Sequence, residues 1–255
     1  MNESKIPGII LYIKVPKIGF VKTRLVSDDL INETQAYEIQ KAMIKDTLQT
    51  LSSLDKRFQP IISYYPEDRL DELKNILQSF TDSISDSFIK SIHFISQEGE
   101  TNGTHFASTF NKAFQLQDIS SCIIIGGDTP HLPKRILKDA IDWLTTQETS
   151  AVLGPSQLGG FYIFGLNSQT NDLDSIFSKN NEFANLLEIS SKYNLKIKLL
   201  PFIFDIDIAD DVSSLFQLSQ ALERNKNNII EKNDIHFPSN TINYLEKHIF
   251  SNNYF

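Results

Sequence analysis

Short apolar runs alternate with longer amphipathic segments along most of the chain. Apolar runs of about four to eight residues are typical of buried strands, whereas apolar residues that recur every three or four positions are typical of helices. We expect strands at residues 9–15, 60–65, 91–95, 121–126, 151–153, 161–166 and 196–207. We expect helices at residues 28–54, 67–80, 104–116, 133–144 and 210–222. This alternation predicts βαβ units and a largely parallel sheet.

The pattern changes after Arg224, where asparagine and lysine dominate residues 225–233. Such a stretch predicts a polar linker. An amphipathic segment that carries Ile242, Leu245 and Ile249 follows it. We therefore divide the chain into a domain at residues 1–224 and a linker and tail at residues 225–255, and expect the tail to dock on the domain or on a second subunit of a homodimer.

The composition indicates an ordinary packed protein, because 40% of the 255 residues are hydrophobic and 22% are charged. No apolar run reaches the roughly eighteen residues of a membrane span, and the N-terminal run lacks the features of a secretory signal. Cys122 is the only cysteine, which excludes an intrachain disulfide. We expect a cytoplasmic protein.

Charge is distributed unevenly along the chain. The net charge of −8 argues against a nucleic-acid-binding surface. Residues 5–27 nevertheless contain no Asp or Glu, and five cations fall there: Lys5, Lys14, Lys17, Lys22 and Arg24. A basic island in an acidic protein predicts a site for a small anion such as a phosphate chain.

The basic island includes a loop, residues 14–25, between the first strand and the first long helix. Ligands of open α/β sheets bind at the carboxyl ends of strands, where this loop lies. Gly19 lets the backbone turn closely, Lys22 and Arg24 can neutralise phosphate oxygens, and Thr23 can donate a hydrogen bond. The spacing is not that of a Walker A motif, and a solvated basic loop is the alternative.

Acidic residues follow two predicted strands. Asp128 comes after the apolar run 123–125 and two glycines, so we expect it at the same sheet edge as the basic loop, where a carboxylate can ligate Mg²⁺. Asp205 and Asp207 alternate with isoleucines and so share one face, and a shared Mg²⁺ would relieve their repulsion. The alternatives are that Asp128 caps a turn and that the acids at 210–211 only favour a helix N-terminus.

A glycine pair, Gly159 and Gly160, precedes the apolar run 161–166. Glycine allows a ligand to approach the backbone closely, as an acceptor would when it lies against the sheet. A plain hairpin turn explains the same pair equally well.

Together these segments resemble a family of bacterial and archaeal glycosyltransferase-A-like proteins in the nucleotide-diphospho-sugar transferase superfamily. The family has a Lys-Thr-Arg-Leu loop, a Gly-Ser-Asp-Cys-Pro-like turn, a Gly-Pro…Asp-Gly-Gly-Tyr segment and an Asp-x-Asp-Thr-Pro-like segment. Their counterparts here are Lys22 to Leu25, Gly127 to Pro130, Gly154 to Tyr162 and Asp205 to Asp211. The resemblance covers residues 6–215 and implies a three-layer α/β/α fold with a mostly parallel, mixed, Rossmann-like central sheet.

The resemblance extends to 2-phospho-lactate guanylyltransferases, which share the Lys-Thr-Arg-Leu loop. It implies that Mg²⁺ or Mn²⁺ binds Asp128 and Asp207, and that Lys22, Arg24 and Asp128 are catalytic. The residues expected at the nucleotide phosphates are Lys14, Gly19, Lys22, Thr23, Arg24 and Gly127. Those expected at the acceptor or sugar are Gly159, Gly160 and Tyr162.

The implied activity is metal-dependent transfer from a nucleotide or nucleotide-sugar donor to a small-molecule acceptor. Glycosyl transfer is favoured, and nucleotidyl transfer with release of pyrophosphate is the alternative. The chain departs from the family pattern at Leu158, where an Asp is usual, and at Ile208 and Ala209, where Thr-Pro is usual. A nucleotide-binding protein without catalysis is therefore a third hypothesis.

Overall fold

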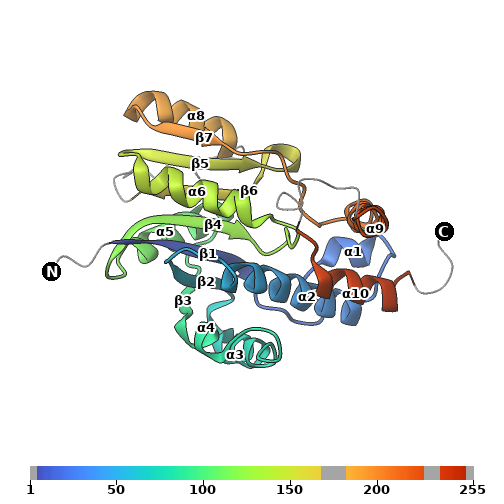
Figure 1. The fold of residues 1–255 in the computed structure, drawn as a ribbon. Helices are drawn as coiled ribbons and strands as arrows, with labels where there is room; N and C mark the ends of the chain where they lie inside the picture. Colours follow the sequence, from blue (N-terminus) through green and yellow to red (C-terminus); the bar gives the residue numbers. More distant parts are fainter. Residues whose placement is uncertain (1–4, 168–181, 227–235, 251–255) are drawn as a thin grey trace.

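The computed structural model describes residues 5–167, 182–226 and 236–250. A seven-stranded sheet, in the order β3-β2-β1-β4-β6-β5-β7, lies between helices (Figure 1). The strands are β1 (Ile6–Lys14), β2 (Gln59–Tyr65), β3 (His93–Ser96), β4 (Ile119–Gly126), β5 (Ser150–Pro155), β6 (Phe161–Asn167) and β7 (Lys196–Leu199). The longer helices are α2 (Glu33–Ser52), α3 (Leu70–Gln78), α5 (Asn102–Phe114), α6 (Lys134–Thr146), α8 (Glu182–Tyr193), α9 (Ala209–Arg224) and α10 (Ser239–His248). The short ones are α1 (Thr23–Ser27), η1 (Glu67–Arg69), α4 (Asp86–Ser91) and η2 (Gln157–Gly159).

Both faces of the sheet are covered. Along β1, Ile9 and Leu11 pack into a core shared with α2, α3, α4 and α6, whereas Ile10 packs into a second core with α5 on the opposite face. A strand buried on both faces has apolar residues at every position, which explains the continuous apolar runs in the sequence. The predicted three-layer α/β/α class is confirmed.

One strand runs against the others. β6 is antiparallel to both of its neighbours, β4 and β5, whereas β1, β2, β3 and β4 pair in parallel. The connection between β5 and β6 therefore lies at the edge where β1 and β4 end. The sheet is mixed and mostly parallel, as predicted.

The last predicted strand, residues 196–207, is too long: β7 ends at Leu199. Pro201, which has no amide hydrogen, follows, and the chain leaves the sheet edge. It continues across the carboxyl ends of the strands, where the Ile203 amide donates to the Pro155 carbonyl and the Ile206 amide donates to the Asp128 carbonyl. The acidic segment, residues 205–207, thus lies beside Asp128, although it is not a strand.

Other boundaries differ because of local capping. The helix expected from residue 28 begins at Glu33, where Asn32 and Gln35 form a reciprocal capping box. The helices α1, α4 and α8 were not predicted; α1 and α4 are only five and six residues long, too short to show helical periodicity. The predicted linker, residues 225–233, lies mostly outside the described residues.

A third apolar cluster joins α1, α2, α9 and α10 at the right of Figure 1. α10 contains the predicted amphipathic tail, and its Ile242 and Leu245 are buried there. The carboxylate of Asp46, on α2, accepts hydrogen bonds from the backbone and side chain of both Asn240 and Thr241 at the start of α10. The tail is therefore held on the domain by both apolar and polar contacts.

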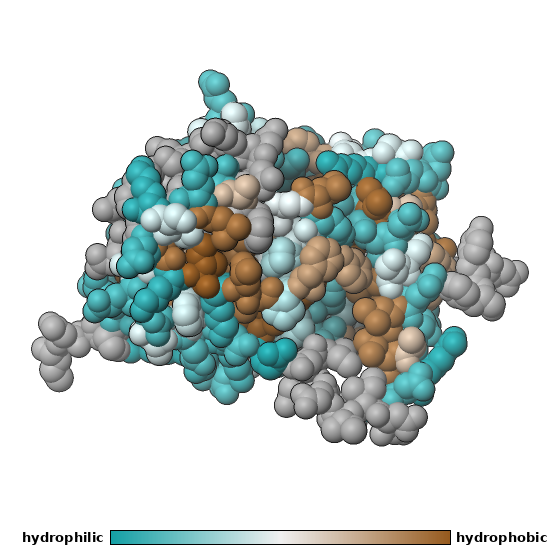
Figure 2. All heavy atoms as spheres, turned by 90° about the horizontal axis from the view of Figure 1, so that it is seen from above, coloured by the Kyte–Doolittle hydropathy of each residue, from teal (hydrophilic) through white to brown (hydrophobic). Residues whose placement is uncertain are grey.

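The β7 edge of the sheet carries exposed apolar side chains, including Leu199 and Phe202. Figure 2, viewed from above, shows apolar side chains gathered on this side of the molecule. Lys196 and Lys198 on β7 place charge along the same edge, a common protection against pairing with other strands. Among the described residues, no helix has the length and apolar character needed to cross a membrane.

Candidate functional site

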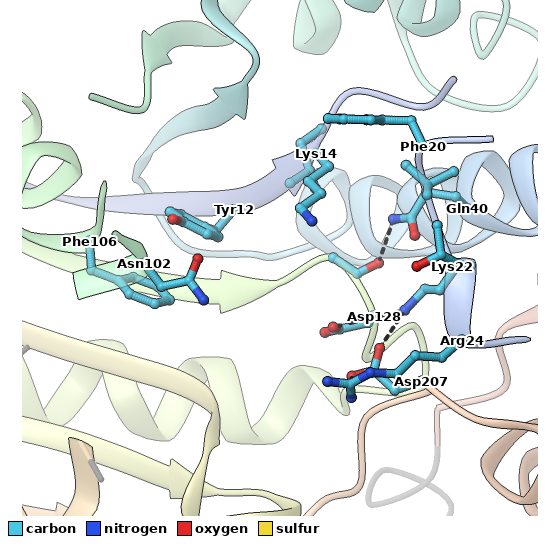
Figure 3. A pocket seen from close by; sticks show the side chains of 14 residues that line it. Tyr12, Lys14, Phe20, Lys22, Arg24, Gln40, Asn102, Phe106, Asp128 and Asp207 are labelled. Atoms are coloured by element: carbon cyan, nitrogen blue, oxygen red, sulfur yellow. Dashed lines mark hydrogen bonds and ion pairs between the residues drawn. The ribbon is translucent and has the colours of Figure 1, made fainter. Parts of the chain in front are cut away.

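A cleft of about 400 Å³ opens where β1 and β4 end (Figure 3). Its lining combines the basic loop, the end of β4, the start of α5 and the acidic segment before α9. The lining residues are Tyr12, Ile13, Lys14, Phe20, Val21, Lys22, Thr23, Arg24, Gln40, Asn102, Phe106, Gly127, Asp128 and Asp207. Cations from residues 14–24 therefore meet acids from residues 128 and 207 in one cleft.

Lys22 lies deepest among the cations, with 6% of its side chain exposed. It precedes α1 with φ 50° and ψ 37°, a left-handed conformation that few non-glycine residues adopt. Its ammonium donates to the Ile206 carbonyl at 2.6 Å and to Asp207 Oδ1 at 3.1 Å, and lies 3.9 Å from Asp128 Oδ2. Such backbone strain, on the order of 1–3 kcal/mol, often marks a functional site.

The other residues of the basic loop surround Lys22. Arg24 Nη1 lies 3.5 Å from Asp207 Oδ2, while 67% of the Arg24 side chain stays exposed at the rim. Lys14 points into the cleft with its ammonium 5.8 Å from the centre of the Phe20 ring. Thr23 also lines the cleft, whereas Gly19 is not a lining residue and has φ 76°, so it supplies the turn of the loop.

Three carboxylates converge beside Lys22. Asp128, Asp205 and Asp207 are all partly buried, and each offers an oxygen within 4.8 Å of those of the other two. Hard oxygen ligands from two or three carboxylates are the donor set that Mg²⁺ and Mn²⁺ prefer. The residues present fit a divalent cation. The alternation of Asp205 and Asp207 with isoleucines predicted a Mg²⁺ shared by these two acids, whereas the resemblance named only Asp128 and Asp207 as metal ligands.

Burial and the neighbouring carboxylates raise the pKa of two of these acids, Asp128 and Asp205. Burial raises the pKa of Asp128, against the lowering effect of Lys22, and Asp207 raises it further. Burial, followed by the charge of Asp128, raises the pKa of Asp205 to about 6. Carboxylates with raised pKa values gain from a neighbouring cation, which makes this group a candidate functional site.

The acidic segment is held by a second layer of contacts. The side chain of Gln157 accepts a hydrogen bond from the Asp205 amide at 2.9 Å and donates to the Asp205 carbonyl at 3.1 Å. Asp211 Oδ2 accepts from the amides of Asp207 and Ile208, both at 2.9 Å. Asp211 thus caps α9, as its position near a predicted helix start suggested, and it also orients Asp207.

Gly127 allows the loop after β4 to pack closely. A Cβ atom there would lie 2.5 Å from a methyl group of Ile13, too close for any side chain. The Gly127 amide donates to the Tyr12 carbonyl, and its carbonyl accepts from the Gln40 side chain, as drawn in Figure 3. Gly127 therefore sets the position of Asp128 against β1.

The residues expected at the acceptor are not in the cleft lining. Gly159 and Gly160 belong to the connection of the antiparallel hairpin β5–β6, so the alternative of a hairpin turn is confirmed. Tyr162, also expected at the acceptor, is only 1% exposed, and its hydroxyl donates to the Pro201 carbonyl. Because β6 is covered on both faces, Tyr162 lies in the core beside Ile163 and not in the cleft lining.

The far end of the cleft is aromatic, which the sequence did not reveal. The rings of Tyr12 and Phe106 stack with centroids 4.4 Å apart, and Asn102 lies beside them (Figure 3). Phe110, on the same helix, is buried in the core. Phe106 is different because it lies one turn earlier, near the start of α5. The cleft therefore has a charged end and an aromatic end.

The fold and the cleft define the class of protein. The fold matches a candidate nucleotide-diphospho-sugar transferase from Desulfovibrio desulfuricans G20, with a TM-score of 0.69, 22% identity and 94% of each chain covered. It also matches a 4-diphosphocytidyl-2C-methyl-D-erythritol synthase from Anaerococcus prevotii, with a TM-score of 0.51, 13% identity and coverage of 82% of this chain and 92% of that one. A cytidylyltransferase from Leptospira borgpetersenii matches with a TM-score of 0.51, 13% identity and 99% of each chain covered. The protein has the nucleotide-diphospho-sugar transferase fold.

The sequence also matches one protein family, which is a narrower class than the fold. Residues 47–179 match the family described as an uncharacterized protein conserved in bacteria, DUF2064. The chain belongs to this family. No curated protein matches the sequence.

Proposed function

We propose that this protein is a divalent-metal-dependent transferase that uses a nucleotide-activated donor, and that it transfers a glycosyl group from a nucleotide-sugar. The observation that carries the proposal is the convergence of Lys22 and Arg24 with Asp128, Asp205 and Asp207. The cations would bind the donor phosphates, and the three carboxylates would hold a divalent metal that supplies further positive charge there. The shared fold with a candidate nucleotide-diphospho-sugar transferase supports this assignment.

Each residue then has a defined part. Lys22 and Arg24 bind phosphate oxygens of the donor, assisted by Lys14 at the start of the loop and by Thr23 between them. Asp128, Asp205 and Asp207 hold Mg²⁺ or Mn²⁺, which when bound supplies positive charge to the leaving phosphate. The protein positions the reactants and stabilises developing negative charge without forming a covalent bond.

The aromatic end of the cleft suits an uncharged part of a substrate. Stacked Tyr12 and Phe106 offer a flat apolar surface, and the Asn102 amide can both donate and accept hydrogen bonds. In this proposal the hairpin with Gly159 and Gly160 lies beside the acceptor and affects catalysis through Gln157, which binds the acidic segment.

The test is turnover with a panel of nucleotide-sugars and Mg²⁺ or Mn²⁺, read as release of the nucleoside phosphate. We expect Asp128→Asn to lower kcat/KM by at least about 100-fold, because a preorganised charge-stabilising group typically contributes that much. Asp142→Asn is the matched control, since Asp142 is exposed on α6 and pairs with Lys56. Equal loss in both variants, or none in Asp128→Asn, would contradict the proposal, and donor binding without product would favour a non-catalytic protein.

Nucleotidyl transfer is the second candidate. It is favoured by the two cations beside the acids, which suit a triphosphate, and by the fold shared with two cytidylyl-transferring proteins. Incubation with nucleoside triphosphates and phosphorylated acceptors would then release pyrophosphate. Pyrophosphate as product, with no reaction of nucleotide-sugars, would replace the first proposal by the second.

A further inference from the structure

Lys22 occupies the place among the acids that a bound cation would take. Its ammonium lies 3.1 Å from Asp207 Oδ1 and 3.9 Å from Asp128 Oδ2, and it donates to the Ile206 carbonyl at 2.6 Å. Figure 3 shows the side chain reaching toward the two carboxylates, with a dashed line from its ammonium to Asp207. With 6% of that side chain exposed, the charge has little access to water. Lys22 is thus a tethered cation inside the candidate metal site.

A tethered cation and a divalent metal compete for the same carboxylates. Both need oxygens of Asp128 and Asp207, and like charges repel strongly at such separations in a partly buried site. The Lys22 ammonium must therefore move when these carboxylates bind a metal. Within the part of the chain that the structure describes, Asp128 and Asp207 are the acidic side chains within ion-pair distance of the Lys22 ammonium, so a metal on both would leave it without a carboxylate partner.

The donor phosphates would be the new partner for Lys22. Three carboxylates with Lys22 and Arg24 leave one excess negative charge, 3 − 2, and a divalent metal would turn this into one excess positive charge. Phosphate oxygens restore the balance and offer acceptors for an ammonium. Metal and donor then each favour the binding of the other, which is a reciprocal coupling.

We propose that Lys22 couples metal binding to donor binding. Its ammonium neutralises Asp128 and Asp207 while the cleft holds no donor, and it moves to the donor phosphates when a metal binds these carboxylates. The inference rests on the proposed function, since it assumes that the acids bind a metal and that the cleft binds a phosphate chain. It adds that the lysine opposes the metal and assists the donor, so its removal has opposite effects on the two.

The experiment measures Mn²⁺ affinity by electron paramagnetic resonance of free Mn²⁺, without any nucleotide. We expect Lys22→Met to bind Mn²⁺ about tenfold more tightly than the unaltered protein, within the range of typical site-to-site coupling. Lys14→Met is the control for net charge, because Lys14 lines the same cleft and has its ammonium near the Phe20 ring. Lys22→Gln is a second variant that keeps a donor for the Ile206 carbonyl, and thermal unfolding verifies that each variant is folded.

A second arm repeats the titration with inorganic phosphate, corrected by a titration without protein. Phosphate should tighten Mn²⁺ binding to the unaltered protein and have less effect on Lys22→Met. Equal Mn²⁺ affinity in Lys22→Met and the unaltered protein, or an equal gain in Lys14→Met, overturns the coupling while metal binding itself stands. Absence of Mn²⁺ binding in every folded protein overturns the metal-dependent function as well, so the two failures are distinguishable.

Discussion

Asp205 contributes to the acid group with its side chain and is held in place by contacts to its backbone. Its carboxylate completes the acid group with Asp128 and Asp207, while its backbone is bound on both sides by Gln157. Two carboxylates are a weak cation site, and a third adds both charge and a fixed ligand. Asp205 therefore belongs with the metal ligands proposed above.

Asp205→Asn should weaken Mn²⁺ binding by at least about tenfold, because the amide removes a negative charge from the site. Titration of Mn²⁺ by electron paramagnetic resonance measures the effect. Asp210→Asn is the matched control, since Asp210 lies five residues later, is exposed in the first turn of α9, and does not belong to the acid group. If both variants bind Mn²⁺ as the unaltered protein does, Asp205 is not a ligand.

The sequence was informative about this cleft wherever a residue's role follows from its place after a strand. The end of β1 and the end of β4 are recognisable from apolar runs, so Lys22 and Asp128 could be assigned to one edge. The aromatic end could not, because Tyr12 and Phe106 come from apolar patterns that look like core. Tyr162 shows the reverse case: its sequence neighbours resemble a ligand loop, but β6 is buried on both faces and Tyr162 lies in the core.

At the scale of elements, the strands were predicted well and the short helices poorly. A buried strand is visible from its own residues, whereas α1 and α4 depend on caps and on tertiary packing. The end of β7 was missed because Pro201 breaks the strand while apolar residues continue beyond it. Those apolar residues pack elsewhere: Ile206 is buried in the helical cluster, and its two neighbours, Asp205 and Asp207, form the acid group with Asp128.

The junction of α2 and α10 is the element-scale feature with the largest expected energetic effect. Asp46 accepts four hydrogen bonds of 2.7–2.9 Å from Asn240 and Thr241, and the N-cap residue Pro238 supplies no side-chain cap. Burial raises the pKa of Asp46, and these hydrogen bonds oppose that rise. A carboxylate from α2 thus replaces the missing cap of α10.

Asp46→Ala should lower the free energy of unfolding by about 2–4 kcal/mol, because it leaves buried donors of α10 without acceptors. Urea denaturation followed by circular dichroism measures the change. Glu38→Ala on the same helix is the control, since Glu38 makes a surface pair with Lys41 and should contribute less than about 1 kcal/mol. A similar midpoint for both variants would contradict the capping role.

For the whole molecule, two histidines make stability depend on pH. Burial, reinforced by the nearby charge of His236, lowers the pKa of His131 from 6.5 to about 4, and burial also lowers that of His236 to about 4. Neither ring nitrogen of His131 has a hydrogen-bond partner among the described residues, and its ring lies 4.6 Å from that of Phe204. Below pH 6.5 the two histidines are protonated in the unfolded chain but stay neutral in the folded chain. The free energy of unfolding therefore decreases as the pH falls from 6.5 towards 4.

The test compares His131→Phe with the unaltered protein at two pH values. A comparison is needed because Asp205, with its raised pKa, makes the free energy of unfolding change with pH in the opposite direction. His131→Phe should match the unaltered protein at about pH 8 and exceed it by about 2 kcal/mol at about pH 5, where only the histidine protein pays for keeping the ring neutral. Urea denaturation at both pH values gives the two free energies. A difference that does not change with pH would show that His131 stays accessible to protons.

The reversed direction of β6 has a consequence for how this architecture diversifies. Because that strand starts, rather than finishes, at the edge where β1 and β4 end, the hairpin before it lies at that edge, and its Gln157 binds the acidic segment. Residues inserted at the hairpin tip, around the fully exposed Leu158, would extend this edge without disturbing either core. A graft of a longer hairpin tip should therefore keep the fold, and it changes the choice of acceptor only if the proposed transferase binds its acceptor at this edge.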